Sequence, residues 1–506
     1  MSNGYLIGID VGTQGTKTAI YDSKGNLISM SSEGSNLLSP SPGVVEQDPD
    51  EIFFSVIRTI KESVNESGVS PKDVAGIAVD AQMAGIMAID EEWNPVTPYD
   101  SWLDKRCEPY ISLMKNQAEE EIIAKTGGQV TYVHGPKVLW WKNEQPDVYK
   151  KISKFVTPAT YVSGRLCGLK AEGAYIDQTH IHFSSFSDTK NSKWDEDLLG
   201  LFDVEAEKMP RIIKPYDVIG KLTDEWAKET GLLAGTPIVA GCGDAAASSL
   251  GAGIVEEGLI YDVAGTASVF SCSTREFSPD IKNKTLFFPS SVIDELYIPL
   301  AYIGGGGLCV SWFSKLHGLS LSELNNLAKE VPAGSENLFF SPHFAGSVCP
   351  NRSELSGAFV GLNWSHNVAH MYRSILESVA YEYRNYFDII SELTHQKYKA
   401  VYGTGGGAKS DVFNQIKADV LGVPYYQLKT EETATYGSAL LAGLGVGMFK
   451  DLSSSSFFDG QLGKQTQPKR SVANLYQVKA KQYNLLLNQL YEFGLKCNGQ
   501  SYEKES

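Results

Sequence analysis

The stretch Thr236-Pro-Ile-Val-Ala-Gly-Cys-Gly-Asp244-Ala-Ala-Ala-Ser-Ser249 decides the fold, because it reads as an apolar strand, a sharp turn and the start of a helix. Gly241 and Gly243 allow the backbone to bend at the strand end and allow a ligand to approach closely. The small residues 245–249 suit a helix whose first amides face the same space. The stretch therefore puts the carboxylate of Asp244 at a strand end, where it is either a helix N-cap or a catalytic group.

A second pattern occurs twice in the chain, once in each half. Residues 5–21 read as an apolar strand, an Asp-Val pair, a turn with Gly and Thr, and a second strand, and residues 259–270 repeat that order. A repeat about half a chain apart is the signature of a duplicated fold. We therefore expect two similar domains that face each other across a cleft, with chance recurrence of a common hairpin as the alternative.

Hydrophobic periodicity predicts an α/β protein, because strands alternate with helices along most of the chain. A β-meander over 5–30 leads to a helix over 48–65, which opens with an N-cap aspartate, a proline and a capping-box glutamate. The predicted domains are 1–254 and 255–506. Further strands are expected at 74–80, 85–90, 297–303, 398–402 and 424–428, helices at 308–317, 365–393, 410–421, 434–447 and 472–493, and a low-complexity loop at 453–456.

The pattern is weaker between residues 98 and 235. Helical patches are predicted near 119–125 and 136–142, and strands near 166–170 and 175–183. His134, His180 and His182 could suggest a metal. However, a His-x-His pair on a polar strand is typical of solvated side chains, and no acidic residue lies at ligand spacing.

Composition limits the function classes. The chain has 506 residues, of which 42% are hydrophobic and 21% charged, as in soluble globular proteins with two or three domains. Its net charge of −16 argues against broad binding to nucleic acids or anionic membranes. The first apolar run has no charged leader, and no apolar stretch has spanning length, so we expect a cytoplasmic protein. Seven cysteines without a Cys-x-x-Cys pair indicate reduced thiols.

Three glycine-bearing turns, at 12–15, 304–307 and 403–407, each follow a predicted strand. Free backbone amides in such turns are what phosphate groups need. The first turn is not a P-loop, because it lacks the four-residue gap before Gly-Lys-Ser/Thr, but Thr13 and Lys17 could still hold phosphate oxygens.

The third turn also supports a rival class. Gly403-x-Gly405-x-x-Ala408 fits the dinucleotide fingerprint of a nicotinamide-dependent oxidoreductase. Against this, Glu431 lies farther downstream than the usual ~20 residues, and Asp10 and Asp244 receive no role.

An ordered set of motifs resembles the FGGY carbohydrate kinases, and within them the xylulokinase-like branch, over roughly residues 5–447. The motifs are Gly8-Ile-Asp10-x-Gly-Thr13-x-Gly-x-Lys17, Gln82-Met83-x-Gly85, Trp102-x-Asp104-x-Arg106, Gly241-x-Gly243-Asp244, Gly265-Thr266 and Gly405-Gly-Gly407-Ala408. The resemblance implies two ribonuclease H-like domains of the actin and hexokinase superfamily. It also implies that sugar binds mainly to the first domain and nucleotide mainly to the second, with phosphoryl transfer from ATP and Mg²⁺ in the cleft.

The resemblance further implies roles for single residues. Asp244 would be the catalytic base, Asp10 the acidic residue oriented to magnesium, and both are candidates for the metal site. Phosphate and nucleotide would meet Thr13, Lys17, Gly265, Thr266, Gly307, Gly406, Gly407 and Asp411. The sugar would meet Gln82, Met83, Trp102, Asp104, Tyr132 and Asp244.

Two departures leave the substrate open. Ala84 stands where the xylulokinase pattern has His, and Ala245 stands where it has an amide side chain, so two polar sugar contacts are missing. A xylulose-like ketopentose is the first expectation, and ribulose, a polyol or gluconate are the alternatives. A non-catalytic sugar sensor is another, although the intact Asp10 and Asp244 argue against it. The expected partner is a small molecule, and a homodimer is an allowed assembly.

Overall fold

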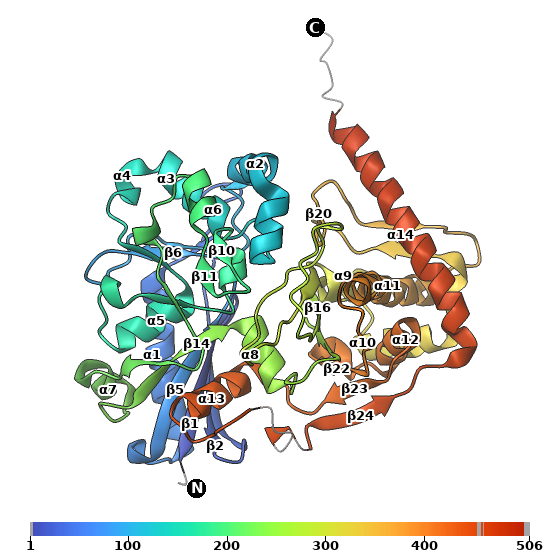
Figure 1. Cartoon of the computed structure of the whole chain (residues 1–506). Coiled ribbons are helices and arrows are strands. Elements are labelled where there is room, and N and C mark those ends of the chain that lie inside the picture. Colours follow the sequence, from blue (N-terminus) through green and yellow to red (C-terminus); the bar gives the residue numbers. More distant parts are fainter. Residues whose placement is uncertain (1–3, 453–456, 459, 500–506) are drawn as a thin grey trace.

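A computed structural model of the chain describes residues 4–452, 457–458 and 460–499. The predicted loop at 453–456 lies outside the described residues. Figure 1 shows two lobes with α8 (Asp244–Gly251) between them. Within the described ranges, no helix is both long enough and apolar enough to cross a membrane.

The first lobe is built on a six-stranded sheet in the order β13-β14-β5-β1-β2-β3. β1, β5 and β14 run parallel to one another, and the other pairs are antiparallel. Helix α1 (Pro49–Ser67) packs on β2 and β3 and begins as predicted, because the side chain of Asp48 accepts a hydrogen bond from the Asp50 amide at 2.8 Å. The strands are β1 (Tyr5–Val11), β2 (Gly15–Asp22), β3 (Leu27–Gly34), β5 (Val74–Ala81), β13 (Val218–Lys221) and β14 (Pro237–Gly243).

The second lobe repeats this topology, with a six-stranded sheet in the order β17-β16-β15-β22-β23-β24. β15, β22 and β23 are parallel, and the remaining pairs are antiparallel. Both sheets thus share one order and one set of strand directions, which confirms the predicted duplication. The strands are β15 (Leu259–Ala264), β16 (Ser268–Cys272), β17 (Leu300–Ile303), β22 (Ala400–Thr404), β23 (Tyr425–Leu428) and β24 (Leu462–Thr466).

Helix α13 (Thr433–Gly445) follows β23 in sequence but packs on the first sheet and on α8. Figure 1 shows this late helix in the first lobe. Two glycines permit the close approach: a Cβ atom on Gly8 would lie 1.8 Å from the Thr435 carbonyl oxygen, and one on Gly437 would lie 2.0 Å from that of Ala247. The helix therefore belongs spatially to the lobe formed by the first half of the chain.

The other helices of the second lobe are α9 (Gly306–His317), α10 (Leu321–Glu330), α11 (Val368–Thr394), α12 (Asp411–Leu421) and α14 (Arg470–Gly499). All but α10 overlap a predicted helix. Short strands β18 (Phe339–Ser341), β19 (Ser347–Val348), β20 (Asn351–Arg352) and β21 (Ala358–Val360) complete this lobe.

The region of weak pattern forms a mixed segment on the first lobe. Its predicted helical patches lie inside α2 (Glu108–Thr126) and α3 (His134–Glu144). The strand expected at 166–170 is wrong, because Leu166 ends α5 (Pro158–Leu166) and Gly168 turns with a φ of 62°. The remaining short elements of the first lobe, inside and outside this region, are β4 (Glu46–Gln47), β6 (Met87–Ile89), β7 (Tyr99–Asp100), β8 (Lys154–Val156), β9 (Tyr175–Asp177), β10 (Ser187–Asp188), β11 (Lys193–Trp194), β12 (Arg211–Ile213), α4 (Pro146–Tyr149), α6 (Glu196–Leu201) and α7 (Asp224–Thr230).

Asp262 is the repeat counterpart of Asp10, yet it is buried inside the second lobe. Its carboxylate accepts hydrogen bonds from the Tyr383 hydroxyl at 2.6 Å, the Tyr425 hydroxyl at 2.7 Å and the Lys417 ammonium at 2.5 Å. Asp262 and Lys417 are both inaccessible to solvent. The second copy of the Asp-Val pattern thus serves the core of its domain.

Candidate active site

Three carboxyl groups meet at the carboxyl ends of the central parallel strands of the first sheet. The strand register pairs Asp10 of β1 with Asp80 of β5, and Asp80 in turn with Cys242 of β14, two residues before Asp244. Ligands bind preferentially at such strand ends in α/β proteins. Asp80 was not among the predicted site residues, although its place at the end of the predicted strand 74–80 was a signal for it.

Burial raises the pKa values of all three groups. The pKa of Asp244 rises to about 6 because its carboxylate is desolvated. That of Asp10 rises to about 7 through burial and the nearby charge of Asp244. Asp80, which accepts a hydrogen bond from the Ser438 hydroxyl at 2.5 Å, has its pKa raised well above the ordinary value by burial and by Asp10. A carboxylate with a pKa close to neutrality, such as Asp244, is well matched to general-base catalysis.

The backbone at the end of β14 aims Asp244. Gly241 adopts a φ of 80°, and a Cβ atom there would lie 1.8 Å from the Val79 carbonyl oxygen, so only glycine fits the irregular pairing at this point. Asp244 is the first residue of α8, and its Oδ1 accepts a hydrogen bond from the Ala245 amide at 2.6 Å. The turn thus holds the carboxylate against the helix N-terminus, as the sequence predicted.

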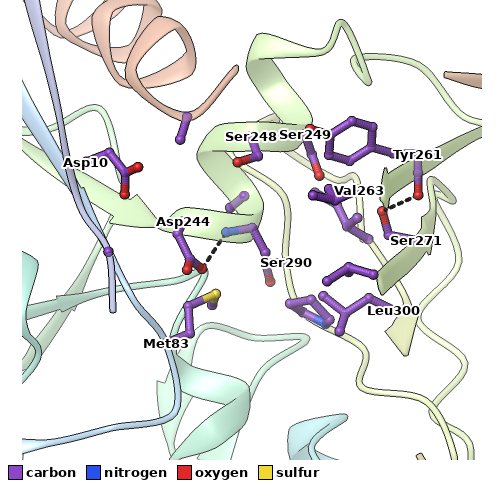
Figure 2. A pocket seen from close by; sticks show the side chains of 17 residues that line it. Asp10, Met83, Asp244, Ser248, Ser249, Tyr261, Val263, Ser271, Ser290 and Leu300 are labelled. Atoms are coloured by element: carbon purple, nitrogen blue, oxygen red, sulfur yellow. Dashed lines mark hydrogen bonds between the residues drawn. The ribbon is translucent and has the colours of Figure 1, made fainter. Parts of the chain in front are cut away.

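A cavity of about 250 Å³ opens beside these carboxylates. Figure 2 shows Asp10 and Asp244 at one end and Tyr261, Ser271 and Leu300 of the second lobe at the other. None of the lining residues, all within the described ranges, is a lysine, arginine or histidine. They are Asp10, Gly12, Met83, Asp244, Ala245, Ala246, Ser248, Ser249, Tyr261, Val263, Val269, Ser271, Pro289, Ser290, Ile298, Leu300 and Ala434.

The structure joins one predicted phosphate residue to two predicted sugar residues. The Trp102 indole donates a hydrogen bond to the Thr13 hydroxyl at 2.9 Å, and that hydroxyl donates to the side-chain Oε1 of Gln82 at 3.1 Å. The Gln82 amide continues the chain by donating to Gln47 at 2.6 Å. Thr13, Gln82 and Trp102 therefore form one connected polar group.

The other predicted sugar residues are placed differently from one another. Met83 lines the cavity. Asp104 is fully buried and its carboxylate is held by the Arg106 guanidinium at 2.8 Å and by the Val45 amide at 2.7 Å. The Tyr132 hydroxyl donates to Glu108 at 2.9 Å. The side chains of Asp104 and Tyr132 are thus engaged within the first lobe, and their contact with a sugar stays a prediction.

The glycine turns of the second lobe come together at the ends of β15 and β22. The Gly307 amide donates to the carbonyl oxygen of Thr266, the residue after Gly265, at 3.0 Å. A Cβ atom on Gly407 would lie 2.7 Å from that of Ala264, whereas one on Gly406 would meet nothing within 4 Å. Asp411, at the start of α12, pairs with Lys464 at 2.7 Å.

Lys17 connects the first hairpin to α13. Its ammonium lies 2.8 Å from the Glu432 carboxylate, directly before the first residue of that helix. Both side chains are partly exposed. A phosphate ligand at Lys17 would compete with this ion pair.

A buried histidine lies behind Asp244, where the sequence predicted solvated side chains. His180 follows β9, and its Nδ1 lies 2.5 Å from the Asp177 carboxylate. The Thr179 hydroxyl accepts a hydrogen bond from the Gly243 amide at 3.0 Å, which fixes this turn against the strand end. His180 lowers the pKa of Asp244, although burial raises it more. The expectation that His180 and His182 are solvated was wrong, because both are buried, as is His134.

Comparisons with known proteins agree with this architecture. The xylulose kinase of Bacillus subtilis (strain 168) is 28% identical over 459 residues, covering 88% of this chain and 89% of the relative. A ligand-bound xylulose kinase structure from Lactobacillus acidophilus matches with a TM-score of 0.89 and 26% identity, over 99% of this chain and 100% of that one. A gluconate kinase structure from the same organism has a TM-score of 0.89 and 26% identity over 100% of both chains.

Family assignment rests on both halves of the sequence. Residues 5–251 match the N-terminal domain of the FGGY family of carbohydrate kinases, and residues 263–446 match its C-terminal domain. The two matches together span most of the chain and both lobes. The protein therefore belongs to the FGGY family of carbohydrate kinases.

Proposed function

We propose that this sugar kinase transfers the γ-phosphoryl group of ATP to a hydroxyl of a small neutral ketopentose of the xylulose type, with Asp244 as the general base. The observation that carries the proposal is the position of Asp244. Its carboxylate lies at the cavity wall, at a strand end, with its pKa raised to about 6. A base with such a pKa is ionised at neutral pH and can still accept a proton in the transition state.

The proposed reaction is a single transfer of the phosphoryl group from ATP to the acceptor hydroxyl. The acceptor hydroxyl binds within hydrogen-bond distance of Asp244, which takes the proton as the hydroxyl oxygen bonds to the γ-phosphorus. The bond between that phosphorus and the oxygen of ADP breaks, and ADP leaves with the electron pair. Positioning and charge stabilisation supply most of the catalysis in such reactions.

The carboxylates fit a magnesium ion. Mg²⁺ is held in kinases by one or two carboxylates together with phosphate oxygens and water. Asp10 and Asp244 both line the cavity, so two carboxylates face the space in which such an ion would lie. When bound, Mg²⁺ neutralises charge on the phosphoryl group. Asp10 would orient it, with Asp244 as a further candidate ligand.

Nucleotide and sugar are assigned to different domains in this proposal. The sugar would occupy the first domain, residues 1–254, and the nucleotide the second, residues 255–506. The convergence of Gly265, Thr266, Gly307 and Gly407 supports a phosphate and adenosine site at these glycine turns. Helix α13 is an exception to the boundary at residue 254, because it belongs to the second range in sequence but packs on the first sheet.

Charge favours a neutral acceptor over a sugar acid. The cavity presents two carboxylates and, among its lining residues, no cationic side chain. The carboxylate of gluconate would meet like charges there without a counterion, and juxtaposed like charges suppress binding of the wrong partner. A ketopentose or a polyol fits this lining better. We also propose a cytoplasmic location, because all seven cysteines are unpaired.

The test is a coupled ADP-release assay over xylulose, ribulose, xylitol and gluconate, with wild-type protein and the Asp244→Asn variant. The variant should bind sugar by calorimetry while its turnover number falls by about 10²–10⁴. Asp224→Asn, at an exposed position in α7, is the matched control and should keep full activity. Near-wild-type turnover in Asp244→Asn would remove the base assignment.

The same assay separates the alternatives. Sugar binding without ADP release by the wild-type protein would indicate a sensor. Reduction of a nicotinamide cofactor would indicate the oxidoreductase. Gluconate as the preferred acceptor would refute the charge argument and leave the kinase assignment intact.

A further inference from the structure

Strand β14 loses its regular pairing just before it delivers Asp244 to the cavity. Its parallel pairing with β5 is interrupted between Val239 and Cys242, where Gly241 adopts a φ of 80°. An irregular strand end changes the direction of the side chains that follow it. The direction of the Asp244 carboxylate therefore depends on what else holds residues 241–243.

Another segment of the first lobe holds this strand end at two points, one on each side of Gly241. The Tyr175 hydroxyl in β9 donates a hydrogen bond to the Ala240 carbonyl oxygen at 2.9 Å. The Thr179 hydroxyl accepts one from the Gly243 amide at 3.0 Å. Both hydrogen bonds are buried, so each is stronger than the same bond would be in water. Strand β9 and the turn after it thus support β14 where its own ladder is irregular.

The turn at residues 177–180 is itself fixed by a carboxylate. Asp177, the last residue of β9, accepts hydrogen bonds through Oδ1 from the Thr179 amide at 2.9 Å and the Thr179 hydroxyl at 2.5 Å. Its Oδ2 lies 2.5 Å from Nδ1 of His180. All three side chains are buried. A continuous chain of hydrogen bonds thus runs from His180 through Asp177 and Thr179 to the amide directly before Asp244.

Core packing alone does not explain the pair of His180 and Asp177. The Nε2 nitrogen of His180 is buried and has no hydrogen-bond partner among the described residues. A buried polar atom without a partner costs free energy, and a buried charged pair often contributes no more stability than well-packed apolar residues. The pair therefore carries a cost that an apolar side chain in its place would not carry.

We propose that Asp177, Thr179 and His180 are positioning residues for phosphoryl transfer, because their hydrogen bonds fix the turn that aims the Asp244 carboxylate at the acceptor hydroxyl. None of the three is among the residues that line the cavity, so they act through the backbone of Gly243. The proposal rests on the assignment of Asp244 as the general base. Such a base must lie within hydrogen-bond reach of its proton, and a misplacement of about 1 Å can cost about 100-fold in rate.

The test is the Thr179→Val variant, which keeps the shape of the side chain and removes its hydroxyl. Its turnover number in the ADP-release assay should fall about 10–100-fold, while the KM for the acceptor changes less than about threefold. Thr179→Ser keeps the hydroxyl and should restore most of the turnover.

Thr126→Val is the matched control for the loss of a buried hydroxyl. Thr126 and Thr179 are both 0% exposed. The Thr126 hydroxyl also accepts a hydrogen bond from a backbone amide, that of Gly128 at 2.9 Å, and it donates to the Ile122 carbonyl oxygen at 2.7 Å. These partners are not connected to Asp244 by the chain of hydrogen bonds described above. The control should therefore keep full turnover.

A double-mutant cycle separates an effect through Asp244 from a general loss of structure. If Thr179 acts only by aiming the base, Thr179→Val should lower the turnover number of the Asp244→Asn protein less than about threefold, because that protein has no base to aim. An equal loss in both backgrounds would overturn the proposal, as would wild-type turnover in Thr179→Val. Near-wild-type turnover in Asp244→Asn alone would instead overturn the base assignment, and the proposal with it.

A second pair of variants keeps the test decisive if Thr179→Val fails to fold. His180→Leu removes the ring nitrogen that Asp177 binds and should lower the turnover number in the same way. His180→Asn supplies an amide nitrogen as a donor to Asp177, so it should recover part of the loss. Circular dichroism checks that each variant is folded. Wild-type turnover in folded His180→Leu would contradict the proposal.

Discussion

Replacing Lys417 with Met should destabilise the second domain, because it leaves the buried carboxylate of Asp262 without its counter-charge. The two groups lie 2.5 Å apart, and neither is accessible to solvent. Methionine has a similar length and no charge, so it keeps most of the packing of the lysine stem. The hydroxyls of Tyr383 and Tyr425 still donate to Asp262, but they carry no positive charge.

The size of the effect can be bounded. Removing one partner of a buried ion pair typically costs 3–5 kcal/mol. We therefore expect a loss of about 3–5 kcal/mol in the free energy of unfolding, out of a total of roughly 5–15 kcal/mol.

Urea unfolding followed by far-UV circular dichroism measures this loss. Lys409→Met is the matched control, because the Lys409–Glu431 pair is 58% and 63% exposed and should contribute less than about 1 kcal/mol. A loss below about 1 kcal/mol at pH 7 would refute the reasoning.

Three further predictions concern the reaction. Ala84 has a φ of 64°, a conformation that histidine tolerates, so the Ala84→His variant should fold. It should change the ranking of ketopentoses and polyols in the ADP-release assay. An unchanged ranking would place residue 84 outside the acceptor site. Lys17→Met should lower the turnover number by more than tenfold with little effect on sugar affinity, whereas a purely structural role in the Glu432 pair would leave turnover intact. Burial raises the pKa of Asp244 to about 6, so its basic form is lost as the pH falls through that value. We therefore expect kcat/KM to decline below about pH 6. A profile that stays flat down to about pH 5 would contradict the assignment of Asp244 as the general base.

Sequence patterns predicted those parts of the fold that local residues determine. The hairpin at 5–22, the capped helix α1 and the Gly-x-Gly-Asp turn each have their cause within a few residues, so periodicity and turn chemistry were sufficient. The duplication followed from two such local patterns. The position of α13 did not follow, because its contact with β1 joins residues more than 400 positions apart and has no local signal.

The candidate site shows the same division. Asp10 and Asp262 stand in matching Asp-Val patterns, but one lines the cavity and the other pairs with Lys417 inside the core. Whether each aspartate is buried or faces the cavity depends on which elements pack on its sheet, and the Asp-Val pattern does not contain that information. His180 and His182 were misjudged for a related reason. Polar neighbours in sequence say little about burial, and both side chains are buried, with His182 packed against Phe287 from the second half of the chain.

The position of α13 also has a consequence for how the protein is made. The first sheet has all its strands once residue 243 leaves the ribosome, but α13, which covers β1 and packs on α8, ends only at residue 445. At about 5–20 residues per second, the roughly 200 intervening residues take on the order of 10–40 s to synthesise. During that time the surface that α13 will cover stays exposed on the nascent chain. Nascent chains halted before residue 433 should therefore bind chaperones, and those extended past residue 445 should release them.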